Sequence, residues 1–435
     1  MNRHRFLGIT LAEGIKARHM LSYLWIALIT SGYAGGLAIL QPSVLELIGV
    51  EHSNQGAVTA GLQLTQEIIF IFLAGLFGIL SERFGRRWVY TGGLIVSALG
   101  YAMYPYARTV NDLFIFRFFY AIGGAAILAM LVTVIADYAS NEHRGKANGL
   151  QGLVVTFGAF VPIILSQLPA HYQSQGMSQT DAITSTFHVA AILGLLTALV
   201  AWLGLAKIQT AQRESRTPFK KIATEGLAAA KSPGVALSYG AAFISRGDLA
   251  VTGAFMMLWG QQYVLDNVAN STISQAQKMT GAEVMGMTVL GALFGAILMT
   301  IFSDRVRRVT AVILSSGLAS IVYLGIYTLE NPFSTYGKVL LFFMGVAELC
   351  AFISSQVLAA EQAPAHRRGV ITGFFGAAGA LGMLVATGLG GFLSKTIGPS
   401  APFIGFGFFN LFVFIWSLAA YKKIKTPETE LLVDQ

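Results

Sequence analysis

Charged side chains are scarce in this sequence. Only 11% of its 435 residues are Asp, Glu, Lys or Arg, whereas soluble globular domains carry about 25%. So few charges cannot cover the surface of a soluble particle of this size, and the mean hydropathy of +0.64 points the same way. The composition therefore excludes an ordinary soluble protein and favours a chain that crosses a membrane many times.

Cysteine is nearly absent as well. Cys350 is the single cysteine and lies in an apolar run, so no disulfide can form within the chain. The seven histidines are scattered, and the sequence shows neither the ligand spacing of a metal site nor a P-loop for a nucleotide. It also lacks a nucleophile–base constellation. We therefore expect no metal, no cofactor and no enzyme activity.

Long apolar runs are abundant. A membrane-spanning helix needs about 20 consecutive apolar residues, and twelve runs qualify. They are Leu21–Val50, Ala57–Ser81, Trp88–Tyr106, Leu113–Ala139, Ala147–Leu168, Phe187–Leu205, Val235–Val264, Val284–Phe302, Val309–Leu329, Val339–Ala360, Gly369–Leu393 and Phe403–Tyr421.

The basic residues between these runs indicate the orientation. With both termini on the cytoplasmic side, most Lys and Arg fall in cytoplasmic connectors and tails, as topology rules require. The outside connectors hold only Arg108, Lys278, Lys338 and Lys395. The formal net charge of +8 thus lies in short connectors and not on one basic face, so we expect no nucleic-acid partner.

The longest connector divides the chain into halves. We predict a cytoplasmic N-terminal segment at residues 1–20, one six-helix bundle at 21–206, a cytoplasmic linker at 207–233, a second six-helix bundle at 234–421 and a cytoplasmic tail at 422–435. In the N-terminal segment, Phe6, Ile9 and Leu11 are expected on the membrane surface.

The two halves repeat short motifs. The basic turn at Gly75–Trp88 has a degraded copy at Gly291–Val309. Asp137 lies near the end of the fourth run, seven residues before an Arg-Gly pair, and Glu361 follows the tenth run with an Arg-Gly pair at the same distance. Matches at two corresponding places indicate a duplicated pair of bundles, an architecture typical of transporters.

The basic turn also carries a family resemblance. It reads Gly78-x-x-x-Glu82-Arg83-x-Gly85-Arg86-Arg87. This resembles the signature between helices two and three of the major facilitator superfamily, with Glu82 where that family usually has Asp. The resemblance implies the major facilitator fold, an all-α membrane protein with twelve transmembrane helices in two pseudo-symmetric six-helix bundles. It also implies alternating access by rocking of the bundles.

The resemblance further implies a cytoplasmic latch that locks one conformation. Glu82 is expected to face the N-terminus of helix eleven near Gly369, where free N–H groups attract an anion, and Arg86 to pair with Asp137. The alternative is that these residues only mark topology. The predicted latch residues are Gly78, Glu82, Arg83, Gly85, Arg86, Asp137, Arg144, Asp304, Arg305, Arg308, Glu361 and Arg368.

Five ionisable residues lie inside the predicted spans, namely Glu67, Arg117, Arg246, Asp248 and Glu348. Such residues are costly in a membrane and mark functional sites. Asp248 and Glu348 are the predicted protonation sites, because a carboxyl group that moves between water and an arginine can take up and release a proton. Arg117 and Arg246 are either their partners or anchors for an anionic substrate. The alternative for the whole set is static pairing between helices.

The function follows from the resemblance and these residues. We predict a secondary active transporter of the cell (inner) membrane, a multi-pass monomer with both termini cytoplasmic, whose partners are a small-molecule substrate and the lipid bilayer. A proton or other ion gradient drives it. Uptake of a polar or anionic solute is favoured over proton-driven efflux of lipophilic or cationic compounds, and a membrane-embedded enzyme or scaffold is the remaining alternative. Predicted substrate contacts are Tyr33, Gln41, Gln63, Trp259, Gln262, Ser355 and Gln356.

Overall fold

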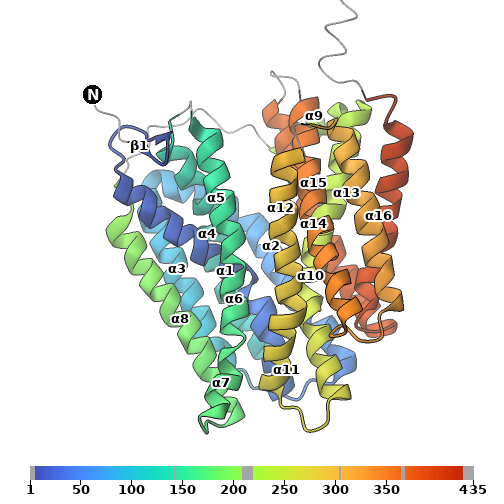
Figure 1. Ribbon diagram of the computed structural model, residues 1–435. Coiled ribbons are helices and arrows are strands. Elements are labelled where there is room, and N and C mark those ends of the chain that lie inside the picture. The colour runs from blue at the N-terminus through green and yellow to red at the C-terminus, as the bar shows by residue number, and fades with distance from the viewer. Residues whose placement is uncertain (1–4, 141–142, 208–218, 303–304, 364–367, 425–435) are drawn as a thin grey trace, which may run out of the picture. The chain divides into compact units, whose positions relative to one another are not determined.

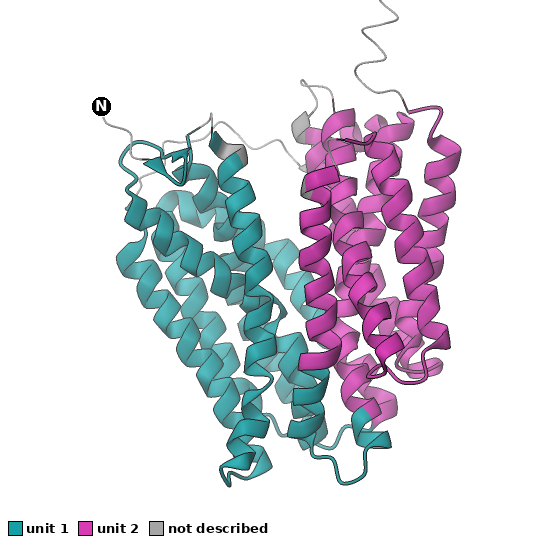
Figure 2. Ribbon diagram, in the orientation of Figure 1, with its two compact units in different colours: residues 1–51, 62–214, 264–281 teal, residues 52–61, 215–263, 282–435 magenta. Residues whose placement is uncertain are grey.

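The computed structural model describes residues 5–140, 143–207, 219–302, 305–363 and 368–424, and most of them are helical (Figure 1). The chain divides into two compact units (Figure 2). Unit 1 comprises Met1–Glu51, Leu62–Glu214 and Val264–Gly281, and unit 2 comprises His52–Gly61, Ser215–Tyr263 and Ala282–Gln435.

Unit 1 contains the elements of the first half of the chain and one short helix of the second half. They are β1 (Arg5–Phe6), β2 (Ile9–Thr10), α1 (Ala17–Leu47), α2 (His52–Phe84), α3 (Arg86–Met103), η1 (Tyr104–Tyr106), α4 (Val110–Tyr138), α5 (Arg144–Gly158), α6 (Phe160–Leu165), α7 (Leu168–Ser174), α8 (Gln179–Gly204) and α11 (Ile273–Met279). The first ten residues of α2, His52–Gly61, belong to unit 2.

Unit 2 contains the other helices of the second half. They are α9 (Phe219–Ala229), α10 (Pro233–Asn267), a π-helical turn η3 (Thr280–Met285), α12 (Gly286–Phe302), α13 (Arg308–Gly325), η4 (Ile326–Thr328), α14 (Thr335–Gln362), α15 (Arg368–Thr396) and α16 (Ala401–Ala420). Residues 264–267 of α10 and 280–281 of η3 belong to unit 1. Helix α9 lies in the predicted linker, where no helix was expected. It is tied to α10 because the Tyr239 hydroxyl donates to the Gly226 carbonyl at 3.3 Å.

The helices confirm the predicted all-α membrane fold class. In the described part of the chain, eleven helices are long and apolar enough to cross a membrane. The remaining predicted run, Trp88–Tyr106, forms α3 and η1. Helix α3 is only 18 residues long and begins with Arg86 and Arg87, and it is not among the eleven.

Local sequence signals set several helix ends. Helix α4 begins at a reciprocal cap, in which the Thr109 N–H donates to the Asp112 carboxylate at 2.9 Å and the Asp112 N–H donates to the Thr109 hydroxyl at 3.3 Å. Helices α2 and α3 meet at Gly85, whose φ of +90° favours glycine. This glycine lets the chain turn sharply at the basic hairpin.

The N-terminal segment packs into unit 1 and does not lie on the membrane surface as expected. Leu11 pairs with Ala139 just after α4, and the Ala12 N–H donates to the Tyr138 carbonyl at 2.9 Å. Ile9 and Leu11 are almost fully buried. The expectation is wrong for these two residues because backbone pairing with a distant segment, which the local sequence does not reveal, covers their side chains.

Candidate functional site

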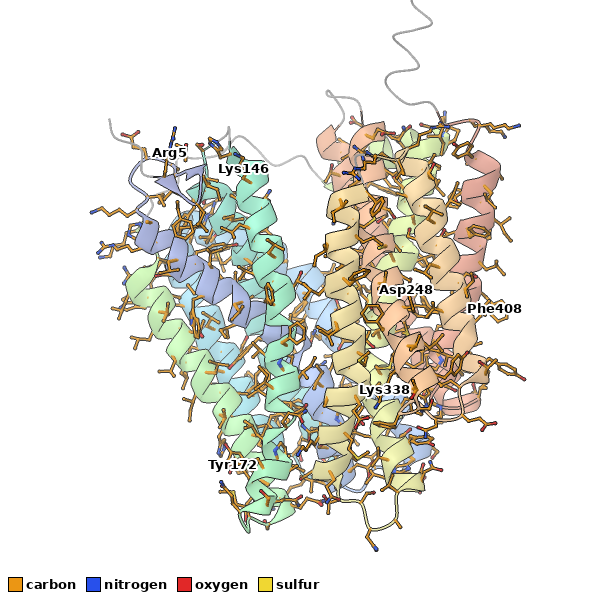
Figure 3. The ribbon with its side chains drawn as sticks, in the orientation of Figure 1. Arg5, Lys146, Tyr172, Asp248, Lys338 and Phe408 are labelled. Carbon is orange, nitrogen blue, oxygen red and sulfur yellow. The ribbon has the colours of Figure 1, made fainter. Side chains whose placement is uncertain are left out.

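Asp248, labelled in Figure 3, lies in unit 2. It belongs to a buried polar cluster. Its side chain, on α10, has no exposed area. Both carboxylate oxygens accept a hydrogen bond from Nδ2 of Asn410 on α16, at 2.9 and 3.0 Å. A neutral amide therefore holds this acid in place.

Glu348, on α14, is the second acid of the cluster. It is 3% exposed and interacts electrostatically with Asp248. The Thr252 hydroxyl, one helical turn after Asp248, hydrogen-bonds to Glu348 and lies 3.2 Å from the Tyr323 hydroxyl. The cluster thus combines two carboxyl groups with one amide and two hydroxyl groups. Among the described residues, no ion pair includes either acid.

Arg246 points to a different neighbour. Its guanidinium carbon lies 4.7 Å from the centroid of the Phe352 ring on α14, a distance at which the cation is attracted to the ring face. The spacing of two residues predicts that Arg246 and Asp248 do not share a helix face, and their different partners agree with this. The structure therefore brings Asp248 and Glu348 together but does not pair them with Arg246.

Arg117 and Glu67 form the corresponding polar network of unit 1. Arg117 on α4 is 2% exposed. Its Nη2 donates to Gln63 Oε1 at 2.7 Å and its Nη1 to Gln41 Oε1 at 3.3 Å. Gln63 Nε2 donates in turn to Glu67 Oε1 at 2.9 Å, so one amide bridges the cation and the anion. Tyr104 also donates to Gln41 Oε1, at 2.9 Å. Two predicted substrate contacts, Gln41 and Gln63, are thus members of this network.

The other predicted substrate contacts take part in packing or hydrogen bonding within their units, or lie at a surface. The buried Tyr33 donates its hydroxyl to a carbonyl of α8. The Trp259 ring lies 5.6 Å from a phenylalanine ring of α16, and the Gln262 amide donates to two oxygen atoms near the start of α2. The Ser355 hydroxyl donates to the carbonyl of residue 352 at 2.8 Å, and Gln356 is exposed. Substrate contact remains a prediction for all of them.

The basic hairpin of unit 1 contains the ion pair that the sequence predicts. Nε of Arg86 lies 3.0 Å from Oδ2 of Asp137, with the two side chains 4% and 12% exposed. Arg86 also donates to the Ser81 hydroxyl, which donates to the Gly78 carbonyl at 2.7 Å. The hairpin thus ties the end of α2, the start of α3 and the end of α4 together.

The second half contains a weaker counterpart. Nε of Arg308 lies 3.7 Å from Oε2 of Glu361, with the side chains 24% and 17% exposed. Arg305 is exposed, and Asp304 lies outside the described residues. This pair is longer and more exposed than that of unit 1, so solvent screens it more.

The remaining latch candidates are at element ends. Glu82 and Arg83 are exposed beside the hairpin. Arg144 and Arg368 are the first residues of α5 and α15. The role of these residues as a latch stays a prediction.

The acidic cluster contains two further polar residues, Asn410 and Tyr323, that the sequence analysis did not predict because they carry no charge. Asn410 and Tyr323 are both buried and reach Asp248 and Thr252, respectively. Asn410 had a visible signal, because it is the only amide side chain within the apolar run Phe403–Tyr421. Tyr323 had none, since tyrosine is common near the ends of membrane spans.

These features define a class of protein: a helical membrane protein with many spans and with buried ionisable groups inside them, as in secondary transporters. The chain belongs to the major facilitator superfamily, whose family model matches residues 23–335 and 250–433. It is accordingly a transporter and not an enzyme.

Known proteins similar to this chain agree with the family. Magnetosome protein MamH of Paramagnetospirillum magneticum is 25% identical over 423 residues, which cover 94% of this chain and 92% of MamH. The crystal structure of the nucleoside transporter NupG has a TM-score of 0.69 at 15% identity and covers 94% of this chain and 99% of its own. That of a D-xylose-proton symporter has a TM-score of 0.66 at 16% identity, over 94% and 97%. The two crystal structures show that the fold is shared.

Proposed function

We propose that this chain is a proton-coupled secondary active transporter of the cell (inner) membrane that moves a small organic solute by alternating access. The observation that carries the proposal is the burial of Asp248 and Glu348, two acids that interact electrostatically inside unit 2. Two carboxylates in an apolar interior repel each other and each is costly to bury. A proton bound by either acid removes one charge, so protonation and burial favour each other.

The cluster has the parts that such coupling needs. Asn410 holds Asp248 by both oxygens, while Glu348 is bound only through Thr252 among the described residues and has one unpartnered oxygen, Oε1. When alternating access admits water, a carboxylate can exchange its proton partner for water. Proton release would then accompany the opening of the cavity, which links the ion gradient to the conformational cycle.

Arg246 supports a polar or anionic solute. Its guanidinium stacks on Phe352, and no hydrogen bond of its side chain occurs within the described part of the chain. Its N–H donors are therefore free to bind a carboxylate or phosphate group. A D-xylose-proton symporter has the same fold, so proton-driven uptake of a polar solute is compatible with this scaffold. Efflux of lipophilic or cationic compounds is the alternative.

A proteoliposome assay tests the proposal. Vesicles containing the purified protein are given a defined metabolite mixture under an imposed pH gradient, and mass spectrometry measures which solute accumulates. We expect uptake with alkalinisation outside the vesicles. Asp248→Asn and Glu348→Gln should abolish accumulation yet leave exchange of the solute between equal pools, because binding and rocking need no net proton transfer.

Glu67→Gln is the matched control, since Glu67 already lies in a network with a cation. It should retain gradient-driven accumulation. If both unit 2 variants accumulate solute like the wild type, the protonation sites are wrong. Acidification outside during solute entry would favour an exchanger over a symporter.

A further inference from the structure

A basic recess lies on unit 1 where α2 meets α3. We use this name for the cavity of about 860 Å³ lined by Arg83, Arg87 and Lys207, among others. Arg86 also lines it but already holds an ion pair with Asp137, and Glu82 is the single acid of the lining. An adjoining cavity of about 480 Å³ shares Arg87 and Lys207 and extends along α1. The recess therefore carries an excess of positive charge.

An apolar groove opens into this recess. It has a volume of about 460 Å³, and all its lining residues but one threonine are apolar, glycine or tryptophan. The lining residues recur at helical spacing on one face of α3 and one face of α8, and include Trp88, Gly92, Ile95, Leu195, Leu199 and Trp202. Ile95, Leu195 and Leu199 are between 40% and 52% exposed. In a membrane-spanning segment, such a surface faces the lipid hydrocarbon.

Two tryptophans mark the junction of the recess and the groove. Trp88 and Trp202 line both cavities, and their rings meet edge to face with centroids 4.4 Å apart. Tryptophan prefers the headgroup level of a bilayer, because its ring is apolar and its N–H is polar. The junction is therefore placed where a lipid changes from headgroup to acyl chain.

Arg87 is oriented for an anion at this junction. Its guanidinium carbon lies 4.3 Å from the centroid of the Trp202 ring. Its side chain makes no hydrogen bond within the described part of the chain, and its buried Nε has no partner there. A guanidinium fixed by an aromatic face, with donors left over, suits a phosphate group.

We propose that the basic recess and the apolar groove together bind one anionic phospholipid of the bilayer. The phosphate of the headgroup binds Arg87 and Lys207, and an acyl chain follows the groove between α3 and α8. A free soluble anion would use the recess alone and leave the groove unexplained, whereas a zwitterionic lipid would leave the excess positive charge uncompensated. The site is independent of the transport proposal, since it contains neither Asp248 nor Glu348.

Native mass spectrometry of the purified protein tests this binding. The protein is titrated with phosphatidylglycerol or with phosphatidylcholine of the same acyl chains, and the retained lipid is measured. We expect phosphatidylglycerol to bind more tightly. Arg87→Gln and Lys207→Gln should each weaken it about fivefold, the effect expected for one basic residue near a membrane surface. Lys395→Gln, which removes an exposed lysine far along the sequence in α15, is the control and should bind like the wild type.

Gly92→Leu tests the groove separately. A Cβ atom at Gly92 meets no atom within 4 Å, so a side chain can begin there in open space, and Gly92 lines the groove. The substitution should weaken phosphatidylglycerol binding while leaving the recess intact. Equal binding of the two lipids, or unchanged binding in Gly92→Leu, would overturn the proposal. Binding of inorganic phosphate as tight as that of phosphatidylglycerol would also overturn it, because the groove would then contribute nothing to recognition.

Discussion

The two units bury their ionisable groups with different partners. In unit 1, the Gln63 amide bridges Arg117 and Glu67, so a cation and an anion are buried together. In unit 2, Asp248 and Glu348 lie together with Asn410, while Arg246 stacks on an aromatic ring instead. A cation–anion network is stable in a single charge state, whereas two adjacent acids gain a second stable state by binding a proton. In terms of the proposed proton coupling, unit 2 would be the unit that handles protons and unit 1 the more static one.

The largest effect is expected from a substitution that removes the charge compensation in unit 1. Arg117→Leu leaves Glu67 buried without its cation and should lower the free energy of unfolding by about 3 kcal/mol or more. Asp248→Asn removes a charge that lacks a cation and should change this free energy little or raise it. Equilibrium unfolding in mixed detergent micelles measures both. Arg108→Gln, at an exposed position just before α4, is the control, and equal losses for Arg117→Leu and Asp248→Asn would contradict the comparison.

A smaller effect is expected from removing the amide that binds Asp248 in unit 2. Asn410→Leu removes the only described hydrogen-bond donor of Asp248 and should cost about 1–3 kcal/mol of the free energy of unfolding. The cost should largely vanish in an Asp248→Leu background, because no buried carboxylate then lacks its donor. A double-mutant cycle by the same unfolding method measures this coupling. Additive losses would mean that Asn410 acts through packing alone.

The smallest effects are expected on transport turnover, when the ion pair at the hairpin of each half is broken. Arg86→Gln breaks a short, buried ion pair and should lower transport turnover by up to about fivefold, while Arg308→Gln breaks a longer, more exposed pair and should lower it by about twofold or less. Solute affinity should stay nearly constant, because a latch affects the conformational cycle and not the binding site. Initial rates over a range of solute concentrations separate the two parameters. A loss of affinity without a loss of turnover would refute the latch.

Much of the fold could be predicted because the local sequence alone determines where a membrane-spanning helix forms. A run of apolar residues must satisfy its own backbone groups in lipid, so it forms a helix almost independently of its neighbours. The predicted runs accordingly correspond to helices from α1 to α16. Short helices such as α9 and α11 were missed, because they lie in polar connectors where no long apolar run marks them.

The site was less predictable, because its partners come from different helices. The sequence singled out Asp248 and Glu348 by their charge, and the structure brings them together. It did not reveal that Asn410, and not an arginine, holds Asp248, since that contact depends on how α10 and α16 pack. Similarly, the sequence singled out Arg117 because it is a charged residue within an apolar run. Its link to Glu67 through Gln63 depends on how the helices of unit 1 pack.

The pairing of the N-terminal segment with the end of α4 has a consequence for biosynthesis. Leu11 and Ala12 are synthesised before α4, but their backbone partners at Ala139 and Tyr138 exist only after α4 has been made. Closing so long a loop has an entropic cost that local helix formation does not have. Leu11 and Ala12 therefore reach these native contacts only after α4 has been synthesised, later than the local contacts of α1 can form.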